Sequence, residues 1–214
     1  DLKMIREKSK ILKLSIILSK IKKVAGVDEV GRGSLAGPVF SAAVILNNNI
    51  NTKEIKDSKK IPFKRRIEIA EYIKKNSIFA VGIASVKEIN RINILNASLL
   101  SMQRALGKLK RKPTIAYIDG NFAPKNTNIK CKTFIKGDEK IFCISAASII
   151  AKVERDLFMI KLSKKFPKYD WHKNFGYGTK AHFCGLIKHG VTKHHRKKFK
   201  PIHNILLEKK RETQ

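Results

Sequence analysis

Runs of apolar residues with two kinds of spacing alternate along the chain and predict its strands and helices. Short runs rich in β-branched residues, bounded by polar or glycine-rich turns, are typical of β-strands. Such runs occur at Val24–Val30, Val39–Leu46, Ile78–Val86, Thr114–Ile118 and Cys131–Ile135. Strong turn signals follow the last two of them, at Asp119-Gly120-Asn121 and Lys136-Gly137-Asp138. We therefore expect both strands to stop at an aspartate-bearing turn.

Helical spacing, with an apolar residue at every third or fourth position, is found in three further segments. They are Lys64–Lys75, Asn93–Leu109 and Ile144–Lys164. From Phe166 onward the chain is basic, with aromatic residues and histidines interleaved, and we expect parts of it to be helical. Strands come first and then alternate with helices. The pattern therefore predicts a mixed α/β domain around one sheet, with a basic C-terminal helical region.

The charge balance points to a polyanionic partner without establishing one. The 214 residues fit one globular domain, and 43% of them are hydrophobic, which is enough to bury a core. Lys and Arg number 47 against 17 Asp and Glu, a formal net charge of +30. Such an excess destabilises a compact chain, and a phosphate backbone would relieve it. The composition of an AT-rich genome, which enriches lysine, isoleucine and asparagine, would explain the excess equally well.

Cysteine usage and the N-terminal segment bear on the compartment. Cys131, Cys143 and Cys184 are odd in number and have no CxxC spacing, which argues against a disulfide framework or a structural zinc site. This fits a reducing cytosol. The apolar run Ile11–Leu18 is too short to cross a bilayer, contains Lys13 and lacks a cleavage site for a signal peptide. We expect residues 1–20 to form a basic amphipathic helix.

Four carboxylates stand at positions suited to holding divalent cations. Asp28 and Glu29 lie within an apolar strand, Asp119 ends another, and Asp138 follows a third. Taken singly, Asp119 and Asp138 are also good turn residues. The adjacent pair Asp28-Glu29 is harder to explain structurally, because two acids in an apolar stretch are costly without a cation. Hard cations such as Mg²⁺ take carboxylate oxygens and leave positions open for water and phosphate.

The glycine-rich turn after the first strand allows two interpretations. Gly31, Gly33 and Ala36 match the loose dinucleotide-binding pattern G-x-G-x-x-A, which must open a helix. Here Pro38 and a β-branched run follow, so that interpretation fails. What remains is a backbone that approaches a ligand closely, with Arg32 able to meet a phosphate or a sugar.

Several motifs of the chain resemble those of a known family. The run Ala25–Leu46, AGVDEVGRGSLAGPVFSAAVIL, is similar to the opening signature of bacterial ribonuclease HII, the type 2 ribonuclease H. The resemblance spans about residues 24–201. Further matches follow in the family's order: DSKK at Asp57–Lys60, NIL at Asn93–Leu95, IDGN at Ile118–Asn121, KGD at Lys136–Asp138, ISAASIIAKVERD at Ile144–Asp156, GYGTKAH at Gly176–His182 and HHRKKF at His194–Phe199.

The resemblance implies a fold, an activity and a metal site. It implies a ribonuclease H-like mixed sheet flanked by helices over residues 21–165, and a helical region over residues 166–214 that clamps the duplex. It implies an endonuclease that cuts the RNA strand of RNA/DNA hybrids and cuts 5′ of ribonucleotides embedded in duplex DNA, leaving a 3′-hydroxyl and a 5′-phosphate. Two divalent ions, Mg²⁺ or Mn²⁺, would be held by Asp28, Glu29, Asp119 and Asp138.

The resemblance also assigns the residues that would bind nucleic acid. The turn Gly31-Arg32-Gly33 would sense the 2′-hydroxyl of the ribonucleotide, and Tyr177 would stack on the neighbouring sugar. The remaining contacts, mostly to phosphate, would come from Lys59, Lys60, His194 and Arg196.

Plainer interpretations exist for several residues of these motifs. Tyr177 could be an ordinary half-buried tyrosine in a Gly-Tyr-Gly turn. The pair His194-His195 resembles half of a metal site, but without a further spaced ligand we expect a solvated or phosphate-facing patch together with Arg196. Ser145 and Ser148 are expected to pack closely against the sheet and not to act as nucleophiles.

The sequence is compatible with three classes of function. One is the type 2 enzyme, a monomer in the cytoplasm without a membrane partner. Another is a catalytically silent nucleic-acid-binding protein, which leaves the four acids unexplained. The third is the type 3 ribonuclease H, which shares the fold but not the preference for a lone ribonucleotide. The Gly-Arg-Gly turn favours type 2, and the intact acids favour an enzyme.

Overall fold

The computed structural model of the chain describes residues 23–55 and 62–212. The predicted helix over residues 1–20 and the predicted phosphate contacts Lys59 and Lys60 lie outside these ranges.

A mixed five-stranded sheet forms the centre of the described chain, in the order β3-β2-β1-β4-β5. The central strand β1 pairs antiparallel with β2 and parallel with β4. The sheet therefore changes from antiparallel to parallel pairing at β1. The predicted strands are confirmed to within two residues at each end. Their bounds are β1 Val24–Val30, β2 Val39–Leu46, β3 Ser77–Ala84, β4 Ile115–Asp119 and β5 Lys130–Phe134.

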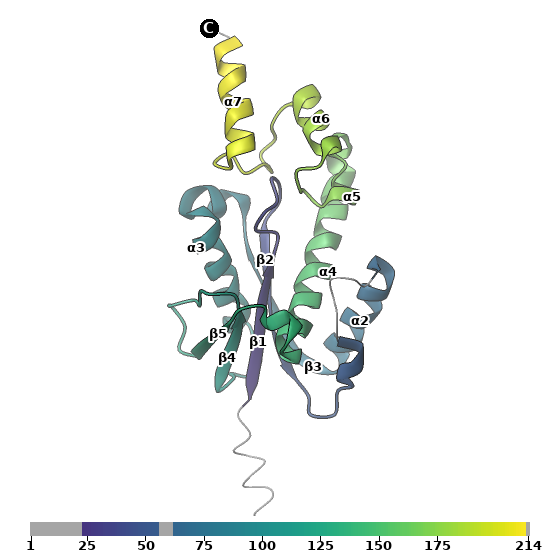
Figure 1. Cartoon of the computed structure of the whole chain (residues 1–214), viewed down its shortest axis with the longest axis vertical. Coiled ribbons are helices and arrows are strands. Elements are labelled where there is room, and N and C mark those ends of the chain that lie inside the picture. Colours follow the sequence, from purple (N-terminus) through teal and green to yellow (C-terminus); the bar gives the residue numbers. More distant parts are fainter. Residues whose placement is uncertain (1–22, 56–61, 213–214) are drawn as a thin grey trace, which may run out of the picture.

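Helices cover both faces of this sheet (Figure 1). Helix α3 (Val86–Gly107) packs on one face, and α4 (Phe142–Lys165), with α2 (Phe63–Lys75) against it, packs on the other. This is the ribonuclease H-like mixed sheet flanked by helices that the resemblance implied. The remaining elements are η1 Thr52–Ile55, η2 Gly137–Glu139, η3 Pro167–Tyr169, α5 Trp171–Asn174, α6 Lys180–His189 and α7 Lys200–Glu212.

Successive side chains of β1 point alternately to the α3 face and the α4 face of the sheet. Ala25 and Val27 are fully buried in the apolar cluster beneath α3. Gly26 faces α4, because a Cβ atom there would lie 2.0 Å from the backbone carbon of Cys143. Successive strand residues point to opposite faces, so Asp28 shares the α4 face with Gly26. The glycine therefore lets α4 lie directly against the strand that carries the acid.

Helix α3 begins seven residues earlier than the apolar spacing predicted. Ser85 caps it through a capping box with Glu88, and this cap also explains why β3 stops at Ala84 and not at Val86. At Asn93 the backbone leaves the helical region, with φ 65° and ψ 172°. The predicted start at Asn93 was therefore wrong for the helix, but it coincides with a real break inside it.

The C-terminal region packs on the loop that joins β1 to β2. Leu35 and Ala36 from this loop share one buried cluster with Met159 of α4, Trp171 and Ile202. Figure 1 shows α6 and α7 at the end of the sheet where this loop lies. The expected helical region after Phe166 is thus present and is anchored to the glycine-rich turn. In the described ranges no helix is long and apolar enough to cross a membrane.

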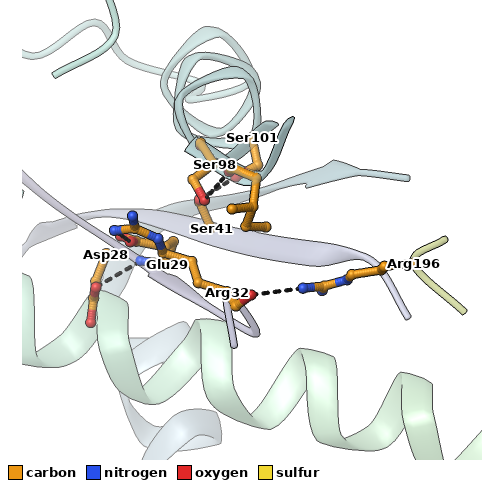
Figure 2. Close-up of polar contacts among 8 residues, drawn as sticks. Asp28, Glu29, Arg32, Ser41, Ser98, Ser101 and Arg196 are labelled. Atoms are coloured by element: carbon orange, nitrogen blue, oxygen red, sulfur yellow. Dashed lines mark hydrogen bonds and ion pairs between the residues drawn. The ribbon is translucent and has the colours of Figure 1, made fainter. Parts of the chain in front are cut away.

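Gly82 of β3 provides a test of how closely α3 packs on the sheet. A Cβ atom at Gly82 would lie 2.0 Å from the Ser101 carbonyl oxygen and 2.5 Å from the Ala105 nitrogen. The buried hydroxyls of Ser41 and Ser101 meet at 2.5 Å across the same interface (Figure 2). We expect Gly82→Ala to lower the free energy of unfolding by about 1–3 kcal/mol, measured by denaturant titration.

The matched control is Gly107→Ala, because a Cβ at Gly107 meets no atom within 4 Å. Alanine is the better helix former, so this variant should be as stable as the parent or slightly more stable. Equal stability of the two variants would mean that α3 does not pack against β3 as described.

Candidate active site

The four predicted acids meet around one cavity at the ends of the strands. In the parallel pair of β1 and β4, Val27 lies opposite Ile118, so the next residues along the two strands are Asp28 and Asp119. The short helix η2 after β5 supplies Asp138. The cavity has a volume of about 310 Å³. Its walls are Asp28, Glu29, Val30, Arg66, Asp119, Asp138, Ser148, Ile149 and Lys152.

Asp28 and Glu29 occupy different surroundings although they are neighbours. Asp28 is 6% exposed, and its Oδ1 accepts a hydrogen bond from the Glu29 N–H at 2.7 Å. An interaction with the Ser148 hydroxyl of α4 favours the charged form of this carboxylate and lowers its pKa. Figure 2 shows Asp28 directed toward α4. Glu29 Oε1 accepts from Arg32 Nη1 at 3.1 Å, whereas its Oε2 is buried without a hydrogen-bond partner among the described residues.

Asp119 and Asp138 are held by backbone contacts of η2. Asp119 Oδ1 accepts from the N–H of Gly137 at 2.7 Å and from that of Asp138 at 3.3 Å. The hydroxyl of Ser145, on α4, donates to the carbonyl of Asp138. Asp119 therefore fixes the turn that carries Asp138, and α4 fixes it from the other side.

The electrostatic state of the site is unfavourable for the protein alone. Burial raises the pKa of Asp28 well above its ordinary value, and the nearby Glu29 and Asp119 raise it further. Burial also raises the pKa of Glu29, although the Arg32 guanidinium opposes this. The fold thus gathers acids where solvation is poor and like charges repel, and a bound cation would reverse both effects.

The donor set fits hard divalent cations. It consists of oxygen atoms from four carboxyls, and one of them, Glu29 Oε2, is buried and without a protein partner. In residues 23–55 and 62–212, no three Asp, Glu, His or Cys side chains converge closely enough to enclose one ion by themselves. Partial protein coordination completed by water and phosphate is the usual mode for Mg²⁺. The site therefore suits ions that are shared with a substrate.

Three residues around the cavity were not predicted from the sequence. Ser148 lines the cavity and lowers the pKa of Asp28, a role beyond the expected packing against the sheet. Ser145 is buried as expected, and its hydroxyl donates to the Asp138 carbonyl of η2. Lys152 and Arg66 line the cavity and pair with the buried Asp156, at 2.8 Å and 3.7 Å. The spacing of Ser145, Ser148, Lys152 and Asp156 along one face of a helix was the available signal.

The glycine turn and Tyr177 lie against each other beside the cavity. The atom nearest to a Cβ built on Gly33 is Tyr177 Cε1, at 4.0 Å. The half-buried Tyr177 ring also lies 5.9 Å from Lys152 Nζ, which lines the cavity. Residues 31–33 and Tyr177, far apart in the sequence, thus form two sides of one surface next to the acids.

The HHR motif differs from the solvated patch that was expected. His194 is half-buried, but His195 and Arg196 are fully buried. The Arg196 guanidinium donates from Nη1 to the Arg32 carbonyl at 2.8 Å, so it faces the glycine turn from inside the protein (Figure 2). The expectation of an open surface at His195 and Arg196 was therefore wrong, because these side chains complete the C-terminal core.

The crowding of acids gives a test that does not depend on catalysis. Asp28→Asn removes a poorly solvated charge and retains an oxygen that can accept from Glu29 N–H. Without metal, we expect the variant to be more stable by roughly 1–2 kcal/mol. Saturating Mn²⁺ should raise the melting temperature of the parent and have much less effect on the variant. Lower stability of the variant together with an unchanged Mn²⁺ shift would contradict a cation site at Asp28.

Comparisons with known proteins identify the family of the chain. A family model for ribonuclease HII matches residues 25–202. The ribonuclease HII of Pelagibacter ubique is 59% identical over 186 residues, which cover 87% of this chain and 100% of the relative. That of Paracoccus denitrificans is 44% identical over 202 residues, covering 94% and 96%.

Solved structures lead to the same family. The ribonuclease HII of Archaeoglobus fulgidus, in its complex with PCNA, superposes with a TM-score of 0.70 at 27% identity, covering 83% of this chain and 95% of that one. A ribonuclease HIII, Bst-RNase HIII in complex with Mn²⁺, has a TM-score of 0.67 at 19% identity, covering 90% and 72%, and shares the fold alone. The chain belongs to the ribonuclease HII family, the type 2 ribonucleases H, which are endonucleases.

Proposed function

We propose that this endonuclease cuts on the 5′ side of ribonucleotides embedded in duplex DNA, and within the RNA strand of RNA/DNA hybrids, leaving a 3′-hydroxyl and a 5′-phosphate. The observation that carries the proposal is the position of the acid-lined cavity beside the surface formed by residues 31–33 and Tyr177. A phosphate in this cavity would have its adjoining ribose within reach of that surface.

Asp28, Glu29, Asp119 and Asp138 would hold two divalent ions, Mg²⁺ or Mn²⁺. When bound, such ions supply positive charge that activates water and stabilises the departing 3′-oxygen. The protein's own residues keep the acids in place. The Glu29 N–H orients Asp28, and Ser148 favours its charged form. The amides of Gly137 and Asp138 orient Asp119. The remaining oxygen of Glu29 stays available, because Arg32 occupies the other one.

Recognition of the ribonucleotide would come from the backbone of the glycine turn. A Cβ at Gly33 would meet no atom closer than Tyr177 Cε1 at 4.0 Å, so the missing side chain leaves room for a sugar to approach the main chain closely. The 2′-hydroxyl both donates and accepts hydrogen bonds and is the group that distinguishes RNA from DNA at one position. Tyr177 would cover the neighbouring sugar from the opposite side of this surface.

Positive charge near the cavity would hold the phosphate backbone. Lys152 and Arg66 line the cavity, and the Arg32 side chain is 48% exposed beside it. We propose that the helical region over residues 166–214 clamps the duplex and that the half-buried His194 contributes to that surface. The enzyme would act as a monomer in the cytoplasm, and its three free cysteines suit a reducing compartment.

The direct test is cleavage of labelled DNA duplexes that contain one ribonucleotide, four ribonucleotides or none. With Mg²⁺ or Mn²⁺ we expect cutting immediately 5′ of the lone ribonucleotide, and with a chelator no cutting. Cutting of the four-ribonucleotide duplex alone would reject the proposed preference. Binding without any cutting would reject the metal-dependent mechanism.

Tyr177 tests the reading surface, that is, the surface formed by residues 31–33 and Tyr177. Tyr177→Ala should reduce kcat/KM on the lone-ribonucleotide duplex by about tenfold more than on the four-ribonucleotide duplex, because stacking of a base or sugar on an aromatic ring is worth about 1–3 kcal/mol. Tyr177→Phe keeps the ring and serves as the control. Equal losses on both duplexes for Tyr177→Ala would argue against a role in recognition.

A further inference from the structure

Two arginine guanidinium groups are buried directly behind the glycine turn. Arg155 of α4 and Arg196 of the segment before α7 are both fully buried. Neither forms an ion pair with a carboxylate in the part of the chain that the structure describes. Burying a cation that no carboxylate contacts directly is costly, and well-packed apolar side chains of similar volume are often at least as stabilising. Their presence therefore calls for a role beyond filling the core.

Arg155 joins the loop after β1 to the loop that carries Tyr177. Its Nε and Nη2 donate to the carbonyls of Pro38 and Ala36 at 3.0 Å and 3.1 Å. Its Nη1 donates to the carbonyl of Phe175 at 3.0 Å, and its guanidinium lies 5.6 Å from the centre of the Tyr177 ring. One planar group thus fixes the distance between the two sides of the reading surface.

The contact of Arg155 with Gly31 explains a glycine of the turn. Gly31 has φ +91°, and a Cβ there would lie 2.1 Å from Arg155 Nε. Gly31 is therefore required by the arginine beneath it, whereas a Cβ at Gly33 would make only an ordinary contact, at 4.0 Å, with Tyr177 Cε1. The two glycines of the turn serve different purposes, one for packing and the other for the approach of a ligand.

Arg196 holds the turn itself. Its Nε donates to the Gly37 carbonyl at 2.9 Å and its Nη1 to the Arg32 carbonyl at 2.8 Å, while Phe199 stacks on the guanidinium at 5.1 Å. Figure 2 shows Arg196 extending toward the Arg32 backbone from a separate segment. Burial and the neighbouring Arg155 lower the pKa of Arg196 to about 9, so it remains charged at pH 7.

The hydrogen bond from Arg196 to the Arg32 carbonyl also sets the direction of the Gly33 N–H. The described peptide bonds are all trans, so the N–H of Gly33 points opposite to the Arg32 carbonyl, away from Arg196. Among the described residues this N–H has no acceptor. A charged donor on the carbonyl side polarises the peptide and strengthens its N–H as a donor. Arg196 thereby presents one strengthened, unpaired N–H beside Tyr177.

We propose that Arg155 and Arg196 are positioning residues that determine the preference for a lone ribonucleotide, by fixing the Gly31–Gly33 turn and its Gly33 N–H at a set distance from Tyr177. This inference rests on the proposed function, in which the turn and Tyr177 read the ribonucleotide. A long RNA stretch offers several registers that can satisfy a loosened surface, but a lone ribonucleotide offers one. Loosening the turn should therefore affect the lone ribonucleotide most.

The test measures kcat/KM on lone- and four-ribonucleotide duplexes for Arg196→Lys and Arg155→Lys. Lysine keeps the positive charge but cannot donate to two carbonyls in the fixed geometry of a guanidinium. We expect the ratio of the two kcat/KM values to fall about tenfold, the effect of losing one oriented hydrogen bond. The matched control is Arg104→Lys, because Arg104 bonds Glu88 and the Ile83 carbonyl away from the turn; its ratio should not change.

A double-mutant cycle separates positioning from general destabilisation. If the arginines act through the reading surface, Arg196→Lys combined with Tyr177→Ala should lower the ratio no further than Tyr177→Ala alone. Additive losses, or equal losses on both duplexes, would overturn the inference. If Arg196→Lys does not fold, Phe199→Leu loosens the same guanidinium while keeping its hydrogen bonds and should lower the ratio in the same direction; an unchanged ratio would overturn the inference.

The same data distinguish failure of this inference from failure of the proposed function. An effect of Tyr177→Ala on the ratio without an effect of the arginine variants overturns the inference alone. No effect of Tyr177→Ala removes the reading role of the surface, and the inference falls with it.

Discussion

The close packing of α4 on β1 is the contact on which the rest of the molecule depends. It is possible because Gly26 has no side chain where the backbone of Cys143 passes. Once α4 lies along the strand, residues one or two turns apart on this helix reach Asp28, the cavity and the glycine turn in succession. Ser148 lowers the pKa of Asp28, Lys152 borders the cavity, and Arg155 supports the glycine turn. One helix thus sets the spacing between the acids and the surface that would read the ribonucleotide.

The distribution of charge follows from the same arrangement. The chain has a net charge of +30, yet four of its few acids gather at one cavity where burial and mutual repulsion raise the pKa of Asp28. Two cations are buried behind the neighbouring turn. The gathering of the acids and the burial of the two arginines both lower the stability of the free protein. Both arrangements become favourable when divalent ions and a polyanionic backbone complete the site, because the protein then supplies fixed charges and dipoles that need no rearrangement.

The strands could be predicted from the sequence because they depend on local signals. The four acids were selected by the motifs that resemble ribonuclease HII, and the structure brings all four to one cavity. Runs rich in β-branched residues and bounded by turn residues predicted β1, β2 and β4, and the parallel pairing of β1 with β4 places Asp28 beside Asp119. The sequence did not predict the burial of Arg196, since its acceptors on Arg32 and Gly37 lie about 160 residues away. It also missed the role of Ser148, which depends on how α4 is rotated against β1. The break at Asn93 arises from a left-handed backbone conformation that apolar spacing does not report.

We propose that the cavity holds divalent ions on these carboxylates next to the nucleic acid. The most direct measurement is an electron paramagnetic resonance titration that counts bound Mn²⁺ in the presence of a lone-ribonucleotide duplex made resistant to cleavage. We expect two ions for each parent chain, and a loss of at least one ion in Asp119→Asn. The absence of bound Mn²⁺, or an unchanged count in that variant, would contradict the account.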